Sequence, residues 1–184
     1  MKQEMAICLW YDDQAEEAVN LYTSIFEDSE IIKVSRFGKE GFEIHGKEEG
    51  TAMTVDFKLN GMNFLALNGG PKFKFNEAIS VVIYCDTQEE IDHYWSKLTE
   101  NGEEGPCGWL KDKYGVSWQI TPTILPRYLT DQKTEKRNRV ERCAFGMKKF
   151  DIETLQKAYN GKKNSHQHWW LFPNTNSLMN DCII

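Results

Sequence analysis

Hydrophobic residues near the N-terminus change their spacing where a short apolar run ends. The run within "MKQEMAICLWYDD" has the length of a strand and stops at two aspartates. Beyond it, apolar residues recur every three or four positions, as on the inner face of an amphipathic helix. The residues of this stripe are Ala15, Ala18, Val19, Tyr22 and Phe26. The pattern predicts a strand followed by a helix with one face to be covered.

The same pattern returns at an offset of 73 residues. The segment "CLWYDDQAEEAVNLYTSI" (8–25) aligns without a gap with "VVIYCDTQEEIDHYWSKL" (81–98). Both predicted helices begin with the spacing of a capping box, formed by Asp13 with Glu16 and by Thr87 with Glu90. An internal duplication is therefore favoured over the alternative, an α+β sandwich whose halves match by chance. The matched pairs include Tyr11 with Tyr84, Asp13 with Asp86, Tyr22 with Trp95 and Ile25 with Leu98.

Strand-like segments follow each predicted helix. In the first copy they span 30–38, 51–61 and 62–70, and Asn60-Gly61 is a hairpin signal between the last two. In the second copy, "CGWLKD" and "VSWQITP" are joined across a glycine, and the remaining strand is either missing or irregular. The predicted order is a strand, a helix and two or three antiparallel strands, repeated once.

This doubled order resembles the vicinal oxygen chelate fold of glyoxalase I, extradiol dioxygenases and the bleomycin- and fosfomycin-resistance proteins. Within that superfamily, "LWYDDQAEEAVNLYTSIF", "ALNGGPKFKFNEAIS", "CDTQEEIDHYWSKL" and "GEEGPCGWLKDKYGVSWQITP" resemble the PhnB-like family, which is often labelled "demethylubiquinone methyltransferase-like". The resemblance covers residues 5 to about 126. It implies an α+β chain with two βαβββ-type modules, about 5–70 and 76–126, whose curved sheets surround a pocket, often beside a partner subunit.

The C-terminal third has a different pattern. Residues 127–161 predict two short helices, and "RVERCAFGMKKFDIETLQKAYNG" resembles the helical extension of many PhnB-like proteins. Asp151 is the expected N-cap of the second helix. Residues 162–184 match nothing in the family, and either a disordered tail or a late change of reading frame fits them. The extension is locally basic through Lys133, Lys136, Arg137, Arg139 and Arg142, which fits a solvated helix face or a contact with an acidic partner.

Composition narrows the classes of function. The formal net charge of −6 argues against a nucleic-acid surface, which needs a basic footprint. No apolar segment has the length that a membrane span or the core of a secretory signal requires. The five cysteines are far apart in the sequence, so we expect reduced thiols in a cytoplasmic protein.

The resemblance also locates the places where metal-using members of the superfamily carry their ligands. These are the first and last strand of each module, here near Ile7, Leu65, Ser80 and Gln119. Aliphatic, hydroxyl and amide side chains bind a divalent cation poorly in comparison with imidazole or carboxylate. None of the four histidines falls on a predicted pocket strand. We therefore expect no metal and no cofactor.

Alternation along the last strand predicts which side chains face the pocket. Val116, Trp118 and Ile120 form an apolar face for the helix, which leaves Ser117, Gln119 and Thr121 for the pocket. An oily half around Leu65 and a hydrogen-bonding half around Gln119 would suit a small amphipathic molecule. The predicted ligand-binding residues are Trp10, Leu65, Asn68, Phe73, Phe75, Trp109, Lys111, Ser117 and Gln119.

Two functions remain open on the sequence. The first is a homodimeric protein that binds a small organic ligand without metal. The second is an isomerase, lyase or transferase of the same superfamily, with Asp112, Glu104 or Cys107 as weak catalytic candidates. Methyl transfer is disfavoured because no glycine-rich strand-to-helix turn is present to hold a methyl donor.

Overall fold

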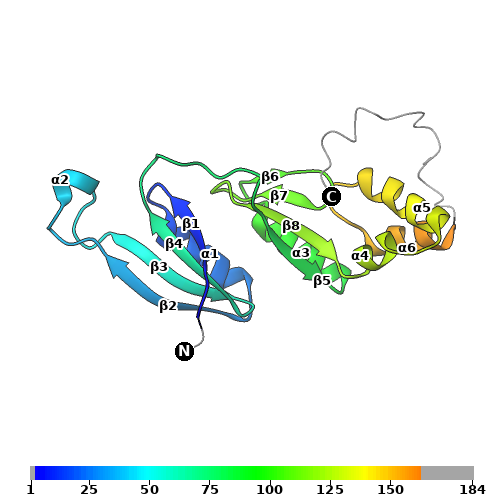
Figure 1. Cartoon of the computed structure of the whole chain (residues 1–184), viewed down its shortest axis with the longest axis horizontal. Helices are drawn as coiled ribbons and strands as arrows, with labels where there is room; N and C mark the ends of the chain where they lie inside the picture. Colours follow the sequence, from blue (N-terminus) through cyan, green and yellow to red (C-terminus); the bar gives the residue numbers. More distant parts are fainter. Residues whose placement is uncertain (1–2, 163–184) are drawn as a thin grey trace. The chain divides into compact units, whose positions relative to one another are not determined.

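The computed structural model describes residues 3–162, and it divides into two compact units, Met1–Phe75 and Asn76–Ile184 (Figure 1). The predicted tail, together with two of the histidines, lies outside the described residues. No helix in the described range is both long enough and apolar enough to cross a membrane.

The first unit is one four-stranded sheet with a helix on one face. The strand order is β1-β4-β3-β2, in which β1 runs parallel to β4 and the other neighbours are antiparallel. The elements are β1 (Ile7–Tyr11), α1 (Ala15–Ile25), β2 (Ser29–Arg36), α2 (Phe42–His45), β3 (Ala52–Leu59) and β4 (Met62–Asn68).

Period-two alternation explains which side of this sheet α1 covers. On β4, Phe64 and Ala66 are buried against the helix, whereas Leu65 on the other face is only half-buried. The turn between β3 and β4 is the predicted hairpin turn, because Asn60 and Gly61 both have positive φ, 47° and 77°.

The second unit repeats this topology and adds three helices. Its sheet has the order β5-β8-β7-β6, again with one parallel pair, β5 with β8. The elements are β5 (Val81–Cys85), α3 (Gln88–Leu98), β6 (Glu103–Glu104), β7 (Trp109–Lys111), β8 (Ser117–Pro122), α4 (Ile124–Leu129), α5 (Thr134–Phe145) and α6 (Ile152–Asn160). The predicted α+β fold with two βαβββ modules is confirmed, and the doubtful strand of the second copy exists as the two-residue β6.

The two copies align at the predicted offset of 73 in their helices but not in their first strands. In the helices the offset of 73 holds, because Tyr22 and Trp95 are both buried in corresponding places. In the first strands it fails: Tyr11 is buried, Tyr84 is 62% exposed, and the buried counterpart of Tyr11 is Cys85. The reason is the link from strand to helix, which has three residues in the first unit and two in the second.

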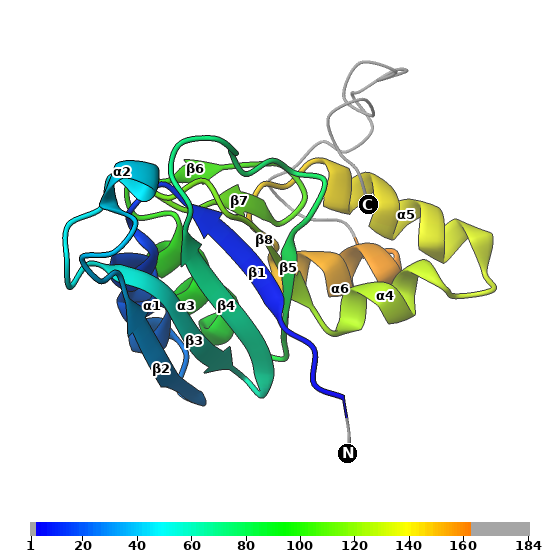
Figure 2. The same cartoon turned by 60° about the vertical axis from the view of Figure 1, so that its left-hand side comes forward.

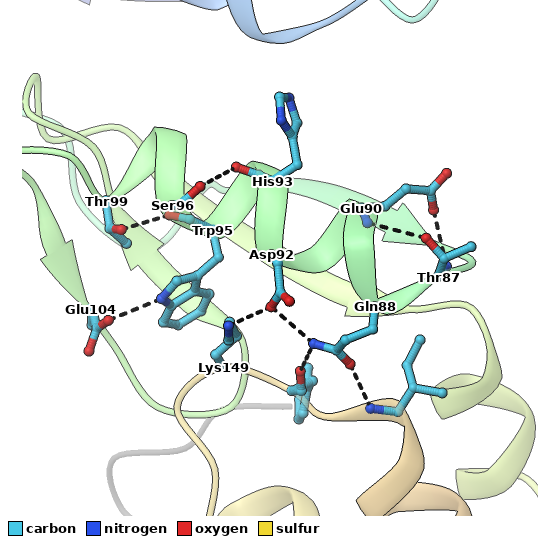
Figure 3. Close-up of polar contacts among 12 residues, drawn as sticks. Thr87, Gln88, Glu90, Asp92, His93, Trp95, Ser96, Thr99, Glu104 and Lys149 are labelled. Carbon is cyan, nitrogen blue, oxygen red and sulfur yellow. Dashed lines mark hydrogen bonds and ion pairs between the residues drawn. The ribbon is translucent and has the colours of Figure 1, made fainter.

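The two helix starts also differ from each other. Thr87 and Glu90 form the predicted capping box of α3 (Figure 3). The capping box predicted at Asp13 is wrong, because the N-cap of α1 is Gln14, which makes no side-chain capping bond. The N–H of Ala15 donates instead to Oδ1 of Asn68, at 2.8 Å.

The two short helices predicted within 127–161 correspond to α5 and α6, and a further helix, α4, begins before that range, directly after β8. The helices α4, α5 and α6 lie side by side in both views (Figures 1 and 2). Asp151 is the N-cap of α6, as predicted, and its Oδ1 accepts from the N–H of Thr154. The extension has a core of its own, made of Cys107, Leu125, Val140, Cys143, Ala144, Phe150 and Leu155.

Candidate functional site

The face of the second sheet that lies away from α3 carries the residues that alternation assigned to a pocket. Trp118 and Ile120 are 1% and 0% exposed on the helix side of β8. Gln119 and Thr121 point the other way and are half-buried. Trp109 lies on the neighbouring strand directly opposite Gln119, so the two side chains share one face.

A cavity of about 220 Å³ lies against this face. The sheet supplies one side of the cavity, and the extension supplies another through α4 and the segment before α6. Most of the lining side chains are apolar, with Gln119 and Thr121 as polar exceptions. The lining residues are Val82, Tyr84, Cys107, Trp109, Gln119, Thr121, Leu125, Pro126, Leu129 and Phe150.

The loop before β7 joins the sheet to the extension. The N–H groups of Cys107 and Gly108 donate to the carbonyls of Met147 and Lys148, both at 2.7 Å. Gly108 has φ of 81°, and a Cβ at this position would lie 2.6 Å from the ring of Phe150. The glycine therefore allows Phe150 to approach the sheet and close one end of the cavity.

Side chains of α3 also bind the segment that leads into α6 (Figure 3). The side-chain amide of Gln88 donates to the carbonyl of Phe150 at 3.2 Å and accepts from the N–H of Ile152 at 2.9 Å. Lys149 forms an ion pair with Asp92, and this contact holds the pKa of the Asp92 carboxyl below its ordinary value. Lys149, the backbone of Phe150 and the backbone of Ile152 are thus anchored to α3.

A second cavity, of about 200 Å³, lies on the same sheet and shares Trp109 with the first. It is more polar, and the ammonium of Lys111 forms an ion pair with Glu77 within it. This pairing raises the pKa of Lys111 and lowers that of Glu77. The second cavity is lined by Glu77, Glu103, Glu104, Gly105, Pro106, Trp109, Leu110, Lys111 and Ser117.

Asp112 is a structural carboxylate and not the predicted acid or base. It is 3% exposed, and Oδ1 accepts from the N–H groups of Tyr114 and Val116 at 2.9 and 3.0 Å. Oδ2 accepts from the indole N–H of Trp118 at 2.9 Å, on the α3 side of the sheet. These bonds shape the turn from β7 to β8, so the catalytic candidacy of Asp112 is corrected.

The other two catalytic candidates are also engaged in the fold. Oε1 of Glu104 accepts from the indole N–H of Trp95 at 3.0 Å (Figure 3). Its Oε2 lies 3.5 Å from Nζ of Lys148. The indole bond is the main cause that lowers the pKa of Glu104, which disfavours it as a proton donor. Cys107 is 4% exposed in the core of the extension, and its Sγ lies 3.6 Å from the carbonyl oxygen of Ala144. Catalysis by Cys107 stays a prediction.

The strand positions that the superfamily uses for metal ligands carry neutral groups here. In the second unit, the amide of Gln119 donates to the hydroxyl of Ser80 at 2.8 Å, so these two predicted positions are neighbours. In the first unit, the residue opposite Leu65 is Cys8, which is adjacent to Ile7 and within the range that the resemblance indicated. Cys8 is exposed on the strand surface, but partial desolvation by its neighbours raises the pKa of its thiol, which disfavours the thiolate that a metal would need.

These donors do not fit a catalytic divalent cation. A hydroxyl bonded to a primary amide, or a thiol beside a leucine, offers neither the charge nor the number of ligands that such an ion requires. Among residues 3–162, no group of three histidine, cysteine, aspartate or glutamate side chains lies close enough to hold a metal.

Three predicted ligand-binding aromatics lie in the first unit. The indole N–H of Trp10 donates to the carbonyl of Gly70 at 2.8 Å, and the ring of Phe73 meets the indole edge-on at 4.9 Å. A Cβ on Gly69 would lie 2.2 Å from the indole, so the glycine makes room for the ring. Phe75 packs edge-on against Tyr11. Ligand binding by these aromatics stays a prediction.

Asn68 does not have the ligand-facing position that the sequence predicted. It is 3% exposed on the α1 side of β4, opposite the face that carries Leu65. Besides accepting from Ala15, its amide donates to the carbonyl of Ala52 at 2.9 Å. Both ends of the amide are used to hold the start of α1 against the sheet, and the ligand contact is withdrawn.

The comparisons with known proteins agree with this architecture. Residues 3–121 match the protein family described as 3-demethylubiquinone-9 3-methyltransferase. The chain belongs to this PhnB-like family. A PhnB structure from Bacillus cereus, called a putative 3-demethylubiquinone-9 3-methyltransferase, is 38% identical, with a TM-score of 0.59. The match covers 66% of this PhnB-like chain and 100% of the Bacillus protein.

Other structures extend the comparison. A Staphylococcus aureus protein is 31% identical over 62% of this chain and 91% of its own, with a TM-score of 0.28. The fosfomycin resistance protein FosX from Listeria monocytogenes is 15% identical over 71% and 99%, with a TM-score of 0.49. Manganese and a dihydroxypropylphosphonic acid are bound to that protein. No curated protein matches this PhnB-like chain.

The structure adds lining residues that sequence reasoning missed. Val82 and Tyr84 lie in the continuous apolar run 81–85, whose two faces no period-two pattern separates. Leu125, Leu129 and Phe150 belong to the extension, which the sequence did not connect with the pocket. For Leu125 and Leu129, the sequence offers only apolar residues at helical spacing directly after β8. That spacing is equally typical of an ordinary core, so it does not indicate a cavity wall.

Proposed function

We propose that this PhnB-like protein binds a small, largely apolar organic molecule in the cavity between the second sheet and the extension. The observation that carries the proposal is the lining of that cavity, where apolar side chains surround Gln119 and Thr121. Ligand sites commonly combine an apolar wall with a few polar groups that fix orientation. At about 220 Å³, the cavity is smaller than the roughly 300–1,000 Å³ of typical ligand pockets, so we expect a small ligand.

Binding without metal is part of the proposal. The Ser80–Gln119 pair leaves neutral donors where metal-using relatives carry charged ligands, and these groups are better suited to hydrogen bonds with an organic molecule. An enzymatic role would need an acid or base on this face. The two carboxylates considered for it, Asp112 and Glu104, are engaged elsewhere in the fold.

Methyl transfer, which the family description names, has little support in the local structure. The links from β1 to α1 and from β5 to α3 contain Asp12, Asp13 and Gln14, and Asp86 and Thr87. Neither link has a glycine that would let the backbone approach a nucleotide-like donor closely. Ligand binding is therefore the function we favour for this chain.

The test is a thermal-shift screen with small metabolites, repeated on a variant with a blocked cavity. Val82→Trp places a large ring in the cavity from a side chain that is 39% exposed, so the core is not disturbed. Ile31→Trp is the matched control, because Ile31 is 40% exposed on a strand of the first unit.

Each hit should stabilise the wild type and the control but not the blocked variant. Equal stabilisation of all three proteins would contradict the proposed site. Hits are then incubated with the protein and analysed for products, and turnover would favour the enzymatic alternative. Stoichiometric, tightly held divalent metal in the purified protein would overturn the metal-free part.

We also propose that the protein is a homodimer, as the superfamily resemblance implied. In the first unit, the sheet face that α1 leaves uncovered carries half-buried Leu65 and Leu67. Apolar side chains in such a position are typical of an interface. Light scattering coupled to gel filtration should give twice the chain mass of 21.4 kDa; a monomer across the concentration range would refute the dimer.

A further inference from the structure

The hydroxyl of Ser117 is the one buried side-chain polar atom without a hydrogen-bond partner between residues 3 and 162. Ser117 is 1% exposed and lines the second cavity. Buried hydroxyl groups in folded proteins nearly always have a partner, because a buried hydroxyl without one loses its hydrogen bonds to water and gains nothing in return. An unpaired hydroxyl beside a cavity is explained when the missing partner is a ligand.

The charges around Ser117 restrict what that ligand group can be. Lys111 lies directly opposite Ser117 across the β7–β8 pair, and its ammonium is already paired with Glu77. Glu103, opposite Lys111 on β6, and Glu104 add further carboxylates to the same cavity. A ligand carboxylate would be repelled by these groups, and a ligand ammonium would compete with Lys111 for Glu77. A neutral group meets neither penalty.

The position of Ser117 relative to the first cavity sets the shape of the ligand. Trp109 lines both cavities, and its strand neighbour Gln119 lies two residues from Ser117 along β8. Two residues of a strand span about 7 Å, close to the length of a phenyl ring with one substituent atom. A single small molecule can therefore contact Trp109 with its apolar part and Ser117 with its end.

We propose that the Ser117 hydroxyl anchors a polar subsite, which takes a neutral oxygen-bearing group, a carbonyl or a hydroxyl, of a ligand whose apolar body lies beside Trp109. The subsite rests on the proposed function, because it supplies the polar end of the same ligand site. Ser117 is a binding residue. A ligand carbonyl would accept a hydrogen bond from its hydroxyl, and a ligand hydroxyl could either donate to that hydroxyl or accept from it.

The first test concerns the free protein. Ser117→Ala removes an unpaired hydroxyl, so the thermal midpoint should stay unchanged or rise. Ser35→Ala is the matched control, because the hydroxyl of Ser35 is hydrogen-bonded to that of Thr54, and its loss should lower the midpoint. A clear fall in the midpoint of Ser117→Ala would show that the hydroxyl has a partner in the fold and would overturn the proposal.

The second test uses three probes of one skeleton: acetophenone, 1-phenylethanol and ethylbenzene. Binding is measured by NMR titration of the wild type, Ser117→Ala and Val82→Trp. The wild type should prefer an oxygen-bearing probe, and the two such probes separate a carbonyl ligand from a hydroxyl ligand. Ser117→Ala should weaken the preferred probe about fivefold to tenfold, the value of one hydrogen bond, and leave ethylbenzene unchanged.

The outcomes separate the subsite from the site itself. One outcome is that all three probes bind the wild type, do not bind Val82→Trp, and bind Ser117→Ala with unchanged affinity. The subsite is then wrong, and the proposed function stands. If binding is the same on the wild type and Val82→Trp, or is absent from both, the proposed function fails and the subsite fails with it.

Discussion

The amide of Asn68 is expected to be worth more to stability than any other single polar side chain of the first unit. Asn68→Ala removes the acceptor of the Ala15 N–H and the donor to the Ala52 carbonyl. Both backbone residues are buried, at 0% and 3% exposure, so water cannot replace the lost bonds. With about 1–3 kcal/mol for each of the two buried groups left unpaired, the loss should be about 2–6 kcal/mol.

Urea unfolding followed by circular dichroism measures this loss. With a slope of about 2 kcal/mol per molar urea, the midpoint should fall by about 1 M or more. Asn63→Ala is the matched control, because Asn63 is half-buried on the other face of the same strand. Asn68→Asp should fall between the wild type and Asn68→Ala, since it keeps the acceptor at the positive end of α1 and loses the donor.

Hydrogen exchange localises the effect. The amide proton of Ala15 should lose protection in Asn68→Ala before the rest of α1 does, because its acceptor is gone. The reasoning is refuted if Asn68→Ala and Asn63→Ala differ by less than about 0.5 kcal/mol, a difference typical of ordinary surface substitutions.

Three further predictions concern caps, pH and thiols. Thr87→Ala should cost about 1 kcal/mol through loss of the α3 cap, whereas Asp13→Ala should be neutral; equal losses in thermal unfolding would contradict the assignment of caps. The folded pKa of Glu104 lies below its ordinary 4.5, so its stabilising contribution is present above about pH 4.5 and is lost as the pH falls towards the folded pKa. Glu104→Gln should therefore lose less stability than the wild type between about pH 5 and pH 3, and parallel pH profiles would count against this. Native alkylation at pH 8 followed by mass spectrometry should modify exposed Cys8 well before Cys85, whose pKa burial raises to about 12; faster labelling of Cys85 would show that its strand opens.

Local patterns were sufficient for the order of the elements and for the two faces of the strands. Period-two alternation separated Trp118 and Ile120 from Gln119 and Thr121, because neighbouring side chains on a strand must point to opposite sides. The capping box at Thr87 was also predictable, since the groups that bond lie within three residues of each other.

The same reasoning failed where the partner of a residue is distant in the sequence. Asp13 had the local spacing of a cap, but the bond went to Asn68, which lies 53 positions from Ala15. The sequence predicted Asp112 as a candidate acid or base. In the structure, its Oδ1 accepts from the N–H of Tyr114 in the turn, and its Oδ2 accepts from the indole of Trp118. A spacing rule reports which groups can meet within a segment, and it cannot report which of them has a better partner elsewhere.

The amino-acid sequence by itself determined the duplicated α+β architecture, the PhnB-like family and the polar face of β8. Only the tertiary structure decided that the extension forms a wall of the cavity, through Phe150 and the anchoring of its neighbours by α3. The physical reason is that strands and helices follow from interactions between near neighbours. A cavity wall depends instead on side chains more than 60 residues apart, whose contact is fixed only when the whole unit packs.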